Sequence, residues 1–260
     1  MPESDLELLI STARAAGKLA LSIDGTQAQK WDKPNGGGLV TEVDLEVNAM
    51  LEDRLRTGRP DYGWLSEESD DTAERLNCEF LFIVDPIDGT RSFVGGSSTW
   101  AHSLAVAHRG QVTAAVIYLP MRDLLYAAST TAVTTLNGTP VGPSQRSNCP
   151  GATVLSNRGS LDPKHWKLGA PPDIKRIHRP SLAYRMALVA QGRFDAVLTV
   201  FPAWEWDVAA GDLILRRAGA KITDIAGNTL SFNNPRPRVP SVVSAGHDLH
   251  KALIDRLRVN

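Results

Sequence analysis

The chain has 260 residues, with 28 Lys or Arg against 29 Asp or Glu, so its formal net charge is −1 at pH 7. This balance argues against a general nucleic-acid-binding protein, which needs a basic face. Apolar runs stay well below the roughly 18 residues of a membrane span. Two cysteines, Cys78 and Cys149, without CxxC spacing exclude zinc-finger, iron–sulfur and disulfide-scaffold proteins.

The first residues are acidic, and no basic segment precedes an apolar one, so no secretory signal is predicted. The cytoplasm is therefore the expected location. A length of 260 residues suits one large domain or two of modest size.

Helices and a flexible loop are predicted in the first quarter of the chain. Ser4 and Glu7 form a capping-box pattern, and apolar residues at helical spacing follow as far as Ile23. The glycine-rich stretch 34–38 predicts a flexible loop, because ordering such a backbone is costly. A second helix is predicted over 44–56.

The middle of the chain favours strands. Short turns separate these runs, which is typical of an antiparallel meander. A polar, turn-rich segment over 142–151 follows, and a boundary between residues 146 and 147 is predicted there. The predicted strands are 80–84, 103–107, 112–118, 124–128 and 132–136.

Strand and helix alternate beyond that boundary. The predicted strands are 153–156, 196–200, 221–224 and 242–244, and the predicted helices are 181–191, 209–218 and 247–258. This alternation indicates α/β organisation. We therefore expect an α+β half over residues 1–146 and an α/β half over residues 147–260.

The most informative segment is 85–90, with the sequence DPIDGT. An apolar strand delivers Asp85 and Asp88 to its carboxyl end, where ligands bind in α/β sheets. Hard carboxylates, with the Ile87 carbonyl between them, suit Mg²⁺, and the N–H groups that follow suit a phosphate. From these residues alone the alternative stays open that both aspartates cap the next helix.

Three other acidic segments have ordinary interpretations when each is taken alone. Segment 41–44 is typical of a helix N-cap, and segment 64–69 of a solvated acidic loop. Segment 204–212 is typical of an N-cap before a helix of small residues, with tryptophans that pack.

Taken together and in order, these segments resemble the inositol monophosphatase family, within the superfamily that includes fructose-1,6-bisphosphatase. The resemblance extends over essentially the whole chain. It implies a layered αβαβα sandwich, in which residues 1–146 supply most metal ligands and residues 147–260 supply Asp207 and substrate contacts. The matching segments are 40–44, 66–69, 85–90, 136–138 and 206–211.

The resemblance implies a Mg²⁺-dependent phosphatase that holds two ions, or three with a weaker one near Glu67. Four clustered carboxylates and a phosphate monoester would repel one another without such cations. Two Mg²⁺ ions neutralise them and lower the pKa of a bound water. The implied ligands are Glu67, Asp85, the Ile87 carbonyl, Asp88 and Asp207, with Asp85 shared between two ions.

The resemblance also implies catalytic and substrate positions. The catalytic positions at the attacking water are Asp44, Thr90 and Glu67. The substrate positions are Gly89 and Thr90 through their N–H groups, Asp207, and Lys33 in the glycine-rich loop. Glu68 matches no ligand position, so its replacement by Gln is expected to cost little.

Histidine chemistry is not expected. The six histidines show no metal-ligand or triad spacing, and surface or satisfied-core positions are predicted for them. They are His102, His108, His165, His178, His247 and His250.

The leaving group is less well specified. Val200 stands where inositol phosphatases carry an acidic residue that contacts a sugar hydroxyl, and valine accepts no hydrogen bond. Segment 205–207, EWD, is similar to that of bacterial 3′(2′),5′-bisphosphate nucleotidases. Trp204 is a candidate to stack on adenine, with simple packing as the alternative.

A second phosphate requires a cation. Arg185 is a candidate, with Arg158 and Arg179 as others, since arginine binds phosphate bidentately. The alternative for Arg185 is an ordinary surface position on the helix. The favoured substrate is 3′-phosphoadenosine 5′-phosphate, then inositol monophosphate. Histidinol phosphate is third, because segment 90–93 resembles some histidinol-phosphate phosphatases.

A non-catalytic regulatory protein of the same fold is the rival class. The expected partner is a small phosphorylated metabolite, without nucleic acid or membrane. The family resemblance further implies a homodimer and inhibition by lithium.

Overall fold

The computed structural model describes residues 4–34 and 37–259. Its helices are α1 (Asp5–Leu21), α2 (Glu42–Gly58), α3 (Thr90–Val94), α4 (Leu182–Ala190), α5 (Glu205–Ala218) and α6 (His247–Ile254). Its strands up to residue 140 are β1 (Lys30–Asp32), β2 (Leu39–Thr41), β3 (Gly63–Ser66), β4 (Phe80–Asp88), β5 (Ala101–His108), β6 (Gln111–Leu119), β7 (Leu124–Ser129), β8 (Ala132–Leu136) and β9 (Thr139–Pro140). The later strands are β10 (Ala152–Ser156), β11 (Ile174–Ile177), β12 (Ala196–Thr199), β13 (Ala203–Trp204), β14 (Lys221–Thr223), β15 (Arg238–Val239) and β16 (Val242–Ala245).

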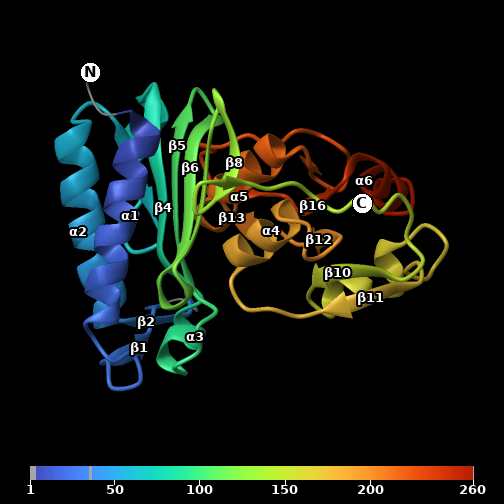
Figure 1. The fold of residues 1–260 in the computed structure, drawn as a ribbon, viewed down its shortest axis with the longest axis horizontal. Coiled ribbons are helices and arrows are strands. Elements are labelled where there is room, and N and C mark those ends of the chain that lie inside the picture. Colours follow the sequence, from blue (N-terminus) through green and yellow to red (C-terminus); the bar gives the residue numbers. More distant parts are fainter. Residues whose placement is uncertain (1–3, 35–36, 260) are drawn as a thin grey trace.

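These elements stack in five layers, which confirms the predicted αβαβα sandwich (Figure 1). Helices α1 and α2 cover one face of a seven-stranded sheet. Helices α4 and α5 lie between that sheet and a five-stranded sheet, and α6 covers the outer face of the second sheet. Among the described residues no helix is both long and apolar enough to cross a bilayer.

Capping residues set the starts of the first two helices. Ser4 Oγ accepts from the Glu7 N–H at 3.3 Å, and the Glu7 carboxylate accepts from the Ser4 N–H at 2.8 Å, as predicted. A second capping box, not predicted as such, joins Thr41 and Asp44. It starts α2 at Glu42, two residues before the predicted start.

The predicted glycine-rich loop lies between β1 and β2, which pair antiparallel. These two short strands were not predicted, because three residues are too few for a period to be visible. Residues 35–36 of the loop lie outside the described residues.

The seven-stranded sheet has the order β3-β4-β5-β6-β7-β8-β9. Strands β5 to β8 form the predicted antiparallel meander, and β4 and β9, which were not predicted to belong to it, extend it at either end. Strand β3 pairs parallel with β4 at one edge and was not predicted. Strand β4 continues to Asp88, four residues beyond its predicted end, so the acidic motif belongs to the sheet itself.

The second sheet has the order β11-β10-β12-β16-β14. Strand β10 pairs parallel with β11 and β12, whereas β16 pairs antiparallel with β12 and β14. Strand–helix alternation along the chain was therefore predicted, but the mixed pairing was not. Helix α5 starts at Glu205 rather than at residue 209, and α6 ends at Ile254 rather than at residue 258.

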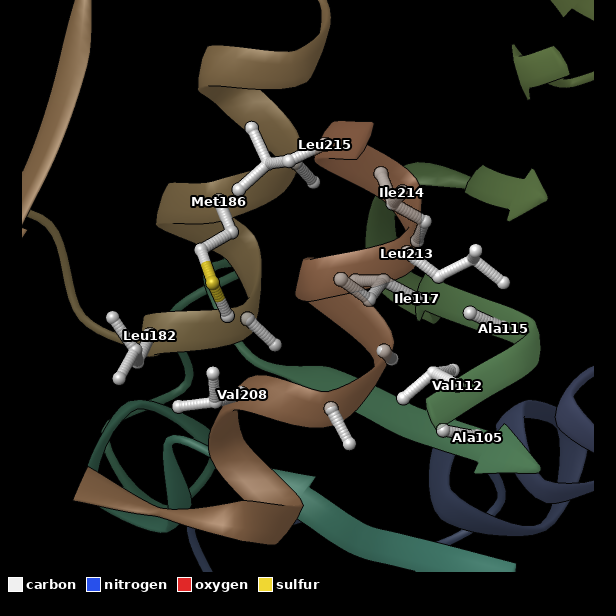
Figure 2. Close-up of a cluster of buried hydrophobic side chains, with 14 of the residues drawn as sticks. Ala105, Val112, Ala115, Ile117, Leu182, Met186, Val208, Leu213, Ile214 and Leu215 are labelled. Atoms are coloured by element: carbon white, nitrogen blue, oxygen red, sulfur yellow. The ribbon is translucent and has the colours of Figure 1, made fainter. Parts of the chain in front are cut away.

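One hydrophobic cluster joins the two sheets through α4 and α5. Leu81 from the first sheet and Leu155 from the second belong to the same cluster as Met186 and Leu213. Figure 2 shows α5 between Met186 of α4 on one side and Ala105 and Ala115 of the seven-stranded sheet on the other. The sheets change between β9 and β10, around residue 146, but this core is continuous. The division into two domains at that point stays a prediction.

Helices α4 and α5 approach closely at Gly211. A Cβ added there would lie 2.3 Å from Met186 Cε and 2.9 Å from Met186 Cβ, so a larger residue must push the helices apart. We predict that Gly211→Val destabilises the chain by about 1–3 kcal/mol. The melting temperature should fall by about 2–4 °C for each kcal/mol.

Gly142→Ala is the control, because a Cβ there meets nothing closer than Ala218 O at 3.6 Å. Calorimetry of the three proteins measures the difference. A Gly211→Val protein that melts with the wild type would contradict the close packing of α4 on α5.

Candidate metal centre

The candidate site is built on a bulge in β4. Asp85 pairs with Ser103 of β5, and the ladder resumes only where Asp88 pairs with Ala101. Two residues of β4, Pro86 and Ile87, thus face one residue of β5, which is the definition of a β-bulge. Proline suits this place, because it has no N–H to give to a regular ladder.

The bulge reverses the alternation of side chains along β4. Before it, Ile83 packs toward α4 and α5, and Val84 packs toward α1 and α2. After it, Ile87 packs with α1 and α2, and Asp88 contacts α4. Three residues apart, two side chains of a regular strand point to opposite faces. The extra residue therefore brings Asp88 onto the face of Asp85.

Asp85 is the most exceptional of the acidic residues. Its side chain is only 1% exposed, and among residues 4–34 and 37–259 no donor reaches either carboxylate oxygen. Burial, together with the charges of Glu67, Asp88 and Asp207, raises the pKa of Asp85 well above its ordinary value. Asp85 can hydrogen-bond with the Asp207 carboxyl only while one of the two is protonated, so with both ionised Asp85 needs a cation.

Two further carboxylates from distant parts of the chain converge on Asp85. Glu67 follows β3, which lies beside β4, and Asp207 stands in the first turn of α5. Glu67, Asp85 and Asp207 each offer an oxygen, and these oxygens lie within 4.8 Å of one another. Three carboxylates at this separation suit a hard divalent cation such as Mg²⁺.

Asp88 lines the same cavity but is bound differently. Its Oδ2 accepts from Ser181 Oγ and from the Ala183 N–H, both at 2.7 Å, at the start of α4. Burial raises its pKa to about 6 although both bonds oppose the rise. Asp88 therefore joins the two halves of the fold beside the group formed by Glu67, Asp85 and Asp207.

These carboxylates open into a cavity of about 310 Å³. The end of β4 and the start of α3 line it, and the sequence-predicted segment 85–90 supplies five of its twelve lining residues. The lining residues are Gly38, Leu39, Glu67, Asp85, Ile87, Asp88, Gly89, Thr90, Arg91, Ser92, Pro180 and Asp207.

A second polar pair stands at the start of α3. Thr90 Oγ donates to Asp44 Oδ1 at 3.1 Å and lies 3.3 Å from the Ile87 carbonyl oxygen. Burial raises the pKa of Asp44. Gly89 just before has a φ of +104°, a conformation that residues with a side chain rarely adopt. The predicted catalytic residues Asp44 and Thr90 are thus in contact beside the carboxylates.

Lys33 reaches the acidic turn and contacts two of its carboxylates. Its Nζ lies 2.8 Å from Glu67 Oε1 and 2.8 Å from Glu68 Oε1. The Glu68 side chain is only 4% exposed, and burial raises its pKa to about 7. Glu68 is thus buried beside Glu67, but the third carboxylate of the close group is Glu67, and the expectation that Glu68→Gln costs little stays a prediction. A cation bound by Glu67 would share that carboxylate with the Lys33 ammonium.

Of the three candidate arginines, Arg185 lies beside the carboxylates. Its charge opposes the rise in pKa that burial causes in Asp88 and Asp207. Its Nε donates to the Ser181 carbonyl at 3.3 Å. Arg158 and Arg179 are exposed, and the Arg179 guanidinium lies over the Phe194 ring, 5.8 Å from its centroid.

Trp204 already has stacking partners within the protein. The Trp206 ring lies 4.7 Å from it at an interplanar angle of 11°, and the Arg238 guanidinium lies 3.7 Å from its centroid. The suggestion that Trp204 stacks on adenine is therefore not supported, and the packing alternative holds. Glu205 is buried and accepts from the N–H groups of Asn233 and Asn234, so it anchors a neighbouring turn.

Sequence analysis missed Asn48, which holds the acidic turn. Its Oδ1 accepts from Ser66 Oγ at 2.6 Å and its Nδ2 donates to Ser69 Oγ at 3.0 Å. Asn48 is one helical turn after Asp44 on α2, so helical spacing was the signal that could have found it.

The bulge, the acidic group and the order of the layers can now be compared with those of known proteins. The model of the inositol monophosphatase family matches residues 1–258, and the chain belongs to this family. It is 30% identical to the protein named Nus factor SuhB of Vibrio cholerae, over 98% of this chain and 96% of the relative. It is 28% identical to the inositol-1-monophosphatase of Mesorhizobium japonicum, over 97% of this chain and 96% of that relative.

A solved structure agrees with this assignment. The IMPase of Thermotoga maritima superimposes with a TM-score of 0.81 at 25% identity, over 96% of this chain and 95% of the other.

No donor pairs with the Asp85 carboxylate among the described residues, and this gives a prediction for stability. Asp85→Asn removes a buried charge and offers an amide that can donate to a neighbouring carboxylate. In EDTA the variant should be more stable than the wild type by about 1–2 kcal/mol. Added Mg²⁺ should raise the melting temperature of the wild type but not that of the variant.

Asp88→Asn is the matched control, because it weakens two charge-assisted hydrogen bonds to α4 and should not stabilise the chain. Thermal denaturation with EDTA and with Mg²⁺ measures both effects. Equal stability of Asp85→Asn and the wild type in EDTA would show that Asp85 bears no uncompensated charge.

Proposed function

We propose that the chain is a Mg²⁺-dependent phosphatase that hydrolyses a small phosphomonoester. The observation that carries this proposal is Asp85, whose two buried oxygens have no donor among the described residues and share a cavity with Glu67 and Asp207. Protein interiors pair buried charges or bind metal with them. Family membership supports the same chemistry.

The groups that would hold the cations are Glu67, Asp85, the Ile87 carbonyl, Asp88 and Asp207, and oxygens of Glu67, Asp85 and Asp207 lie within 4.8 Å of one another. When bound, Mg²⁺ supplies charge neutralisation for the phosphate and lowers the pKa of water. Two Mg²⁺ ions would balance the charge of the four clustered carboxylates, and a third, weaker ion near Glu67 would offset part of the charge of a bound phosphate.

The chain's own residues orient the reactants. Thr90 donates its hydroxyl proton to Asp44, so its lone pairs are free to accept from a water molecule. The buried Asp44 carboxylate, with its raised pKa, can take up the proton that this water loses. The N–H groups of Gly89 and Thr90 stand at the start of α3. The first N–H groups of a helix have no acceptor within that helix, so these two can donate to phosphate oxygens.

Phosphate release gives the direct test. We expect the wild type to release phosphate from small phosphomonoesters only with Mg²⁺ present. Asp85→Asn should lower kcat/KM by at least about 10³-fold, because it removes the charge that both cations share. Glu68→Gln leaves the three close carboxylates intact and only loosens Lys33, so its loss should stay within about tenfold.

Two outcomes would contradict this assignment. If Glu68→Gln is as damaging as Asp85→Asn, the acidic turn supplies a different ligand. If the wild type binds Mg²⁺ but hydrolyses no small phosphomonoester, the chain is a regulatory protein, a role that the name Nus factor suggests for the Vibrio relative.

For the substrate we favour a phosphomonoester with a second anionic group, of which 3′-phosphoadenosine 5′-phosphate is the example. Arg185 supports this preference, because it is a half-buried cation beside Asp88 and Asp207. Trp204 no longer supports it. Inositol 1-phosphate is the alternative, supported by the name of the Mesorhizobium relative, and histidinol phosphate is the third.

Arg185→Gln separates these substrates. The variant should lose about tenfold or more in kcat/KM for 3′-phosphoadenosine 5′-phosphate relative to inositol 1-phosphate, because a charged hydrogen-bond pair contributes about 1.5–3 kcal/mol. Arg179→Gln, at an exposed position, is the control and should leave the ratio unchanged. A wild type that prefers inositol 1-phosphate, or an Arg185→Gln ratio equal to that of the wild type, would overturn the preference.

The homodimer, the cytoplasmic location, the lithium sensitivity and the absence of a nucleic-acid partner stay predictions. Sedimentation of the pure chain and phosphate release in LiCl test two of them directly.

A further inference from the structure

His102 lies behind the bulge, on the opposite face of the sheet from the acidic cavity. Its side chain is fully buried, and it is the residue of β5 that faces Pro86 and Ile87 across the ladder. Its even-numbered neighbours Leu104 and Val106 pack in the core under α1 and α2. His102 therefore contacts the motif from the side away from Asp85 and Asp88.

The ring makes one hydrogen bond, to the Pro86 carbonyl oxygen through Nδ1. A carbonyl oxygen only accepts, so Nδ1 must carry the proton in this contact. Among the described residues no partner reaches Nε2. The bond to Pro86 is thus the polar interaction by which this buried ring is oriented.

Aromatic neighbours hold the ring in place. The Trp100 ring lies 5.4 Å away at 74°, and the Tyr118 ring lies 6.4 Å away at 40°. Trp100 also meets Phe93 of α3 edge-on, with ring centroids 5.2 Å apart. The same packed group therefore contacts the bulge and the short helix that starts at Thr90.

We propose that His102 is a positioning residue of the metal centre: its Nδ1–H holds the Pro86 carbonyl and so fixes the bulge that brings Asp85 and Asp88 into one cavity. The inference rests on the proposed function, because it concerns how well the site binds Mg²⁺. His102 touches neither the cavity nor the reacting atoms, so it acts through the backbone of residues 85–88.

The reason is geometric. Metal ligands must be held within about 0.5 Å of their places, and the side chain of Asp88 faces the cavity only while the bulge stays between residues 85 and 88. Without the bond at Pro86, the segment can exchange between this bulge and other registers. Loss of an interaction that orients ligands from outside typically lowers metal affinity by about 10–100-fold.

Two substitutions test the Nδ1–H directly. His102→Phe keeps an aromatic ring in the same packing but has no donor. His102→Asn places an amide nitrogen near the position of Nδ1 and keeps the donor. His108→Phe is the matched control, because His108 lies at the end of the same strand, stacks on Phe80 and is 36% exposed.

The main measurement is Mg²⁺ affinity by titration calorimetry, with melting temperatures in EDTA for the same proteins. His102→Phe should bind Mg²⁺ about tenfold more weakly. His102→Asn should recover most of the affinity, and His108→Phe should match the wild type. Saturating Mg²⁺ should restore most of kcat in His102→Phe, since no reacting group is changed.

If His102→Phe binds Mg²⁺ as tightly as the wild type, the inference is overturned. It is also overturned if His102→Phe and His102→Asn lose the same amount of Mg²⁺ affinity. If His102→Phe does not fold, the comparison passes to His102→Asn and His102→Gln, because Gln places its amide near Nε2 instead. Tighter Mg²⁺ binding by Asn than by Gln supports the inference, and equal binding overturns it.

Measurements on the wild-type protein distinguish a failure of this inference from a failure of the proposed function. If wild-type protein binds no Mg²⁺ and releases no phosphate, the proposed function fails. If it does both, while the His102 variants bind Mg²⁺ as tightly, only the role of His102 fails.

Discussion

Repulsion among buried carboxylates is the constraint on which the rest of this structure depends. Glu67, Asp85, Asp88 and Asp207 gather in one cavity, and burial raises the pKa of the last three. Such a group is unstable by itself, so the surrounding elements must hold it together. The parallel pair β3–β4, the bulge in β4 and the start of α5 each bring one part of it.

Two protein cations partly balance this charge. Lys33 contacts Glu67 and Glu68 from the β1–β2 segment. Arg185 lies on α4, and its positive charge partly offsets the rise in the pKa of Asp88 and Asp207. Neither makes a hydrogen bond to Asp85. The unbalanced charge is therefore concentrated at the position where the proposed cations would be shared.

Many helices and strands were predictable because their signals are local: periodic apolar residues indicated α1, α2 and the strands of the meander, and segment 85–90 supplied Asp85 and Asp88. The layer order and the convergence of Glu67 and Asp207 on these aspartates followed only from the family resemblance. The role of His102 was not predictable, because it depends on the pairing of β4 with β5 across a bulge. The stacking of Arg238 on Trp204 likewise joins residues 34 positions apart, which no spacing rule connects.

Asp88 links the seven-stranded sheet to α4. Its carboxylate binds the first turn of α4, where Ser181 takes a φ of +62° that non-glycine residues seldom adopt. Replacing Asp88 therefore breaks the contact between β4 and α4 as well as removing a carboxylate from the cavity. This structural role is independent of any turnover, so an acidic residue at position 88 is by itself no evidence of catalysis.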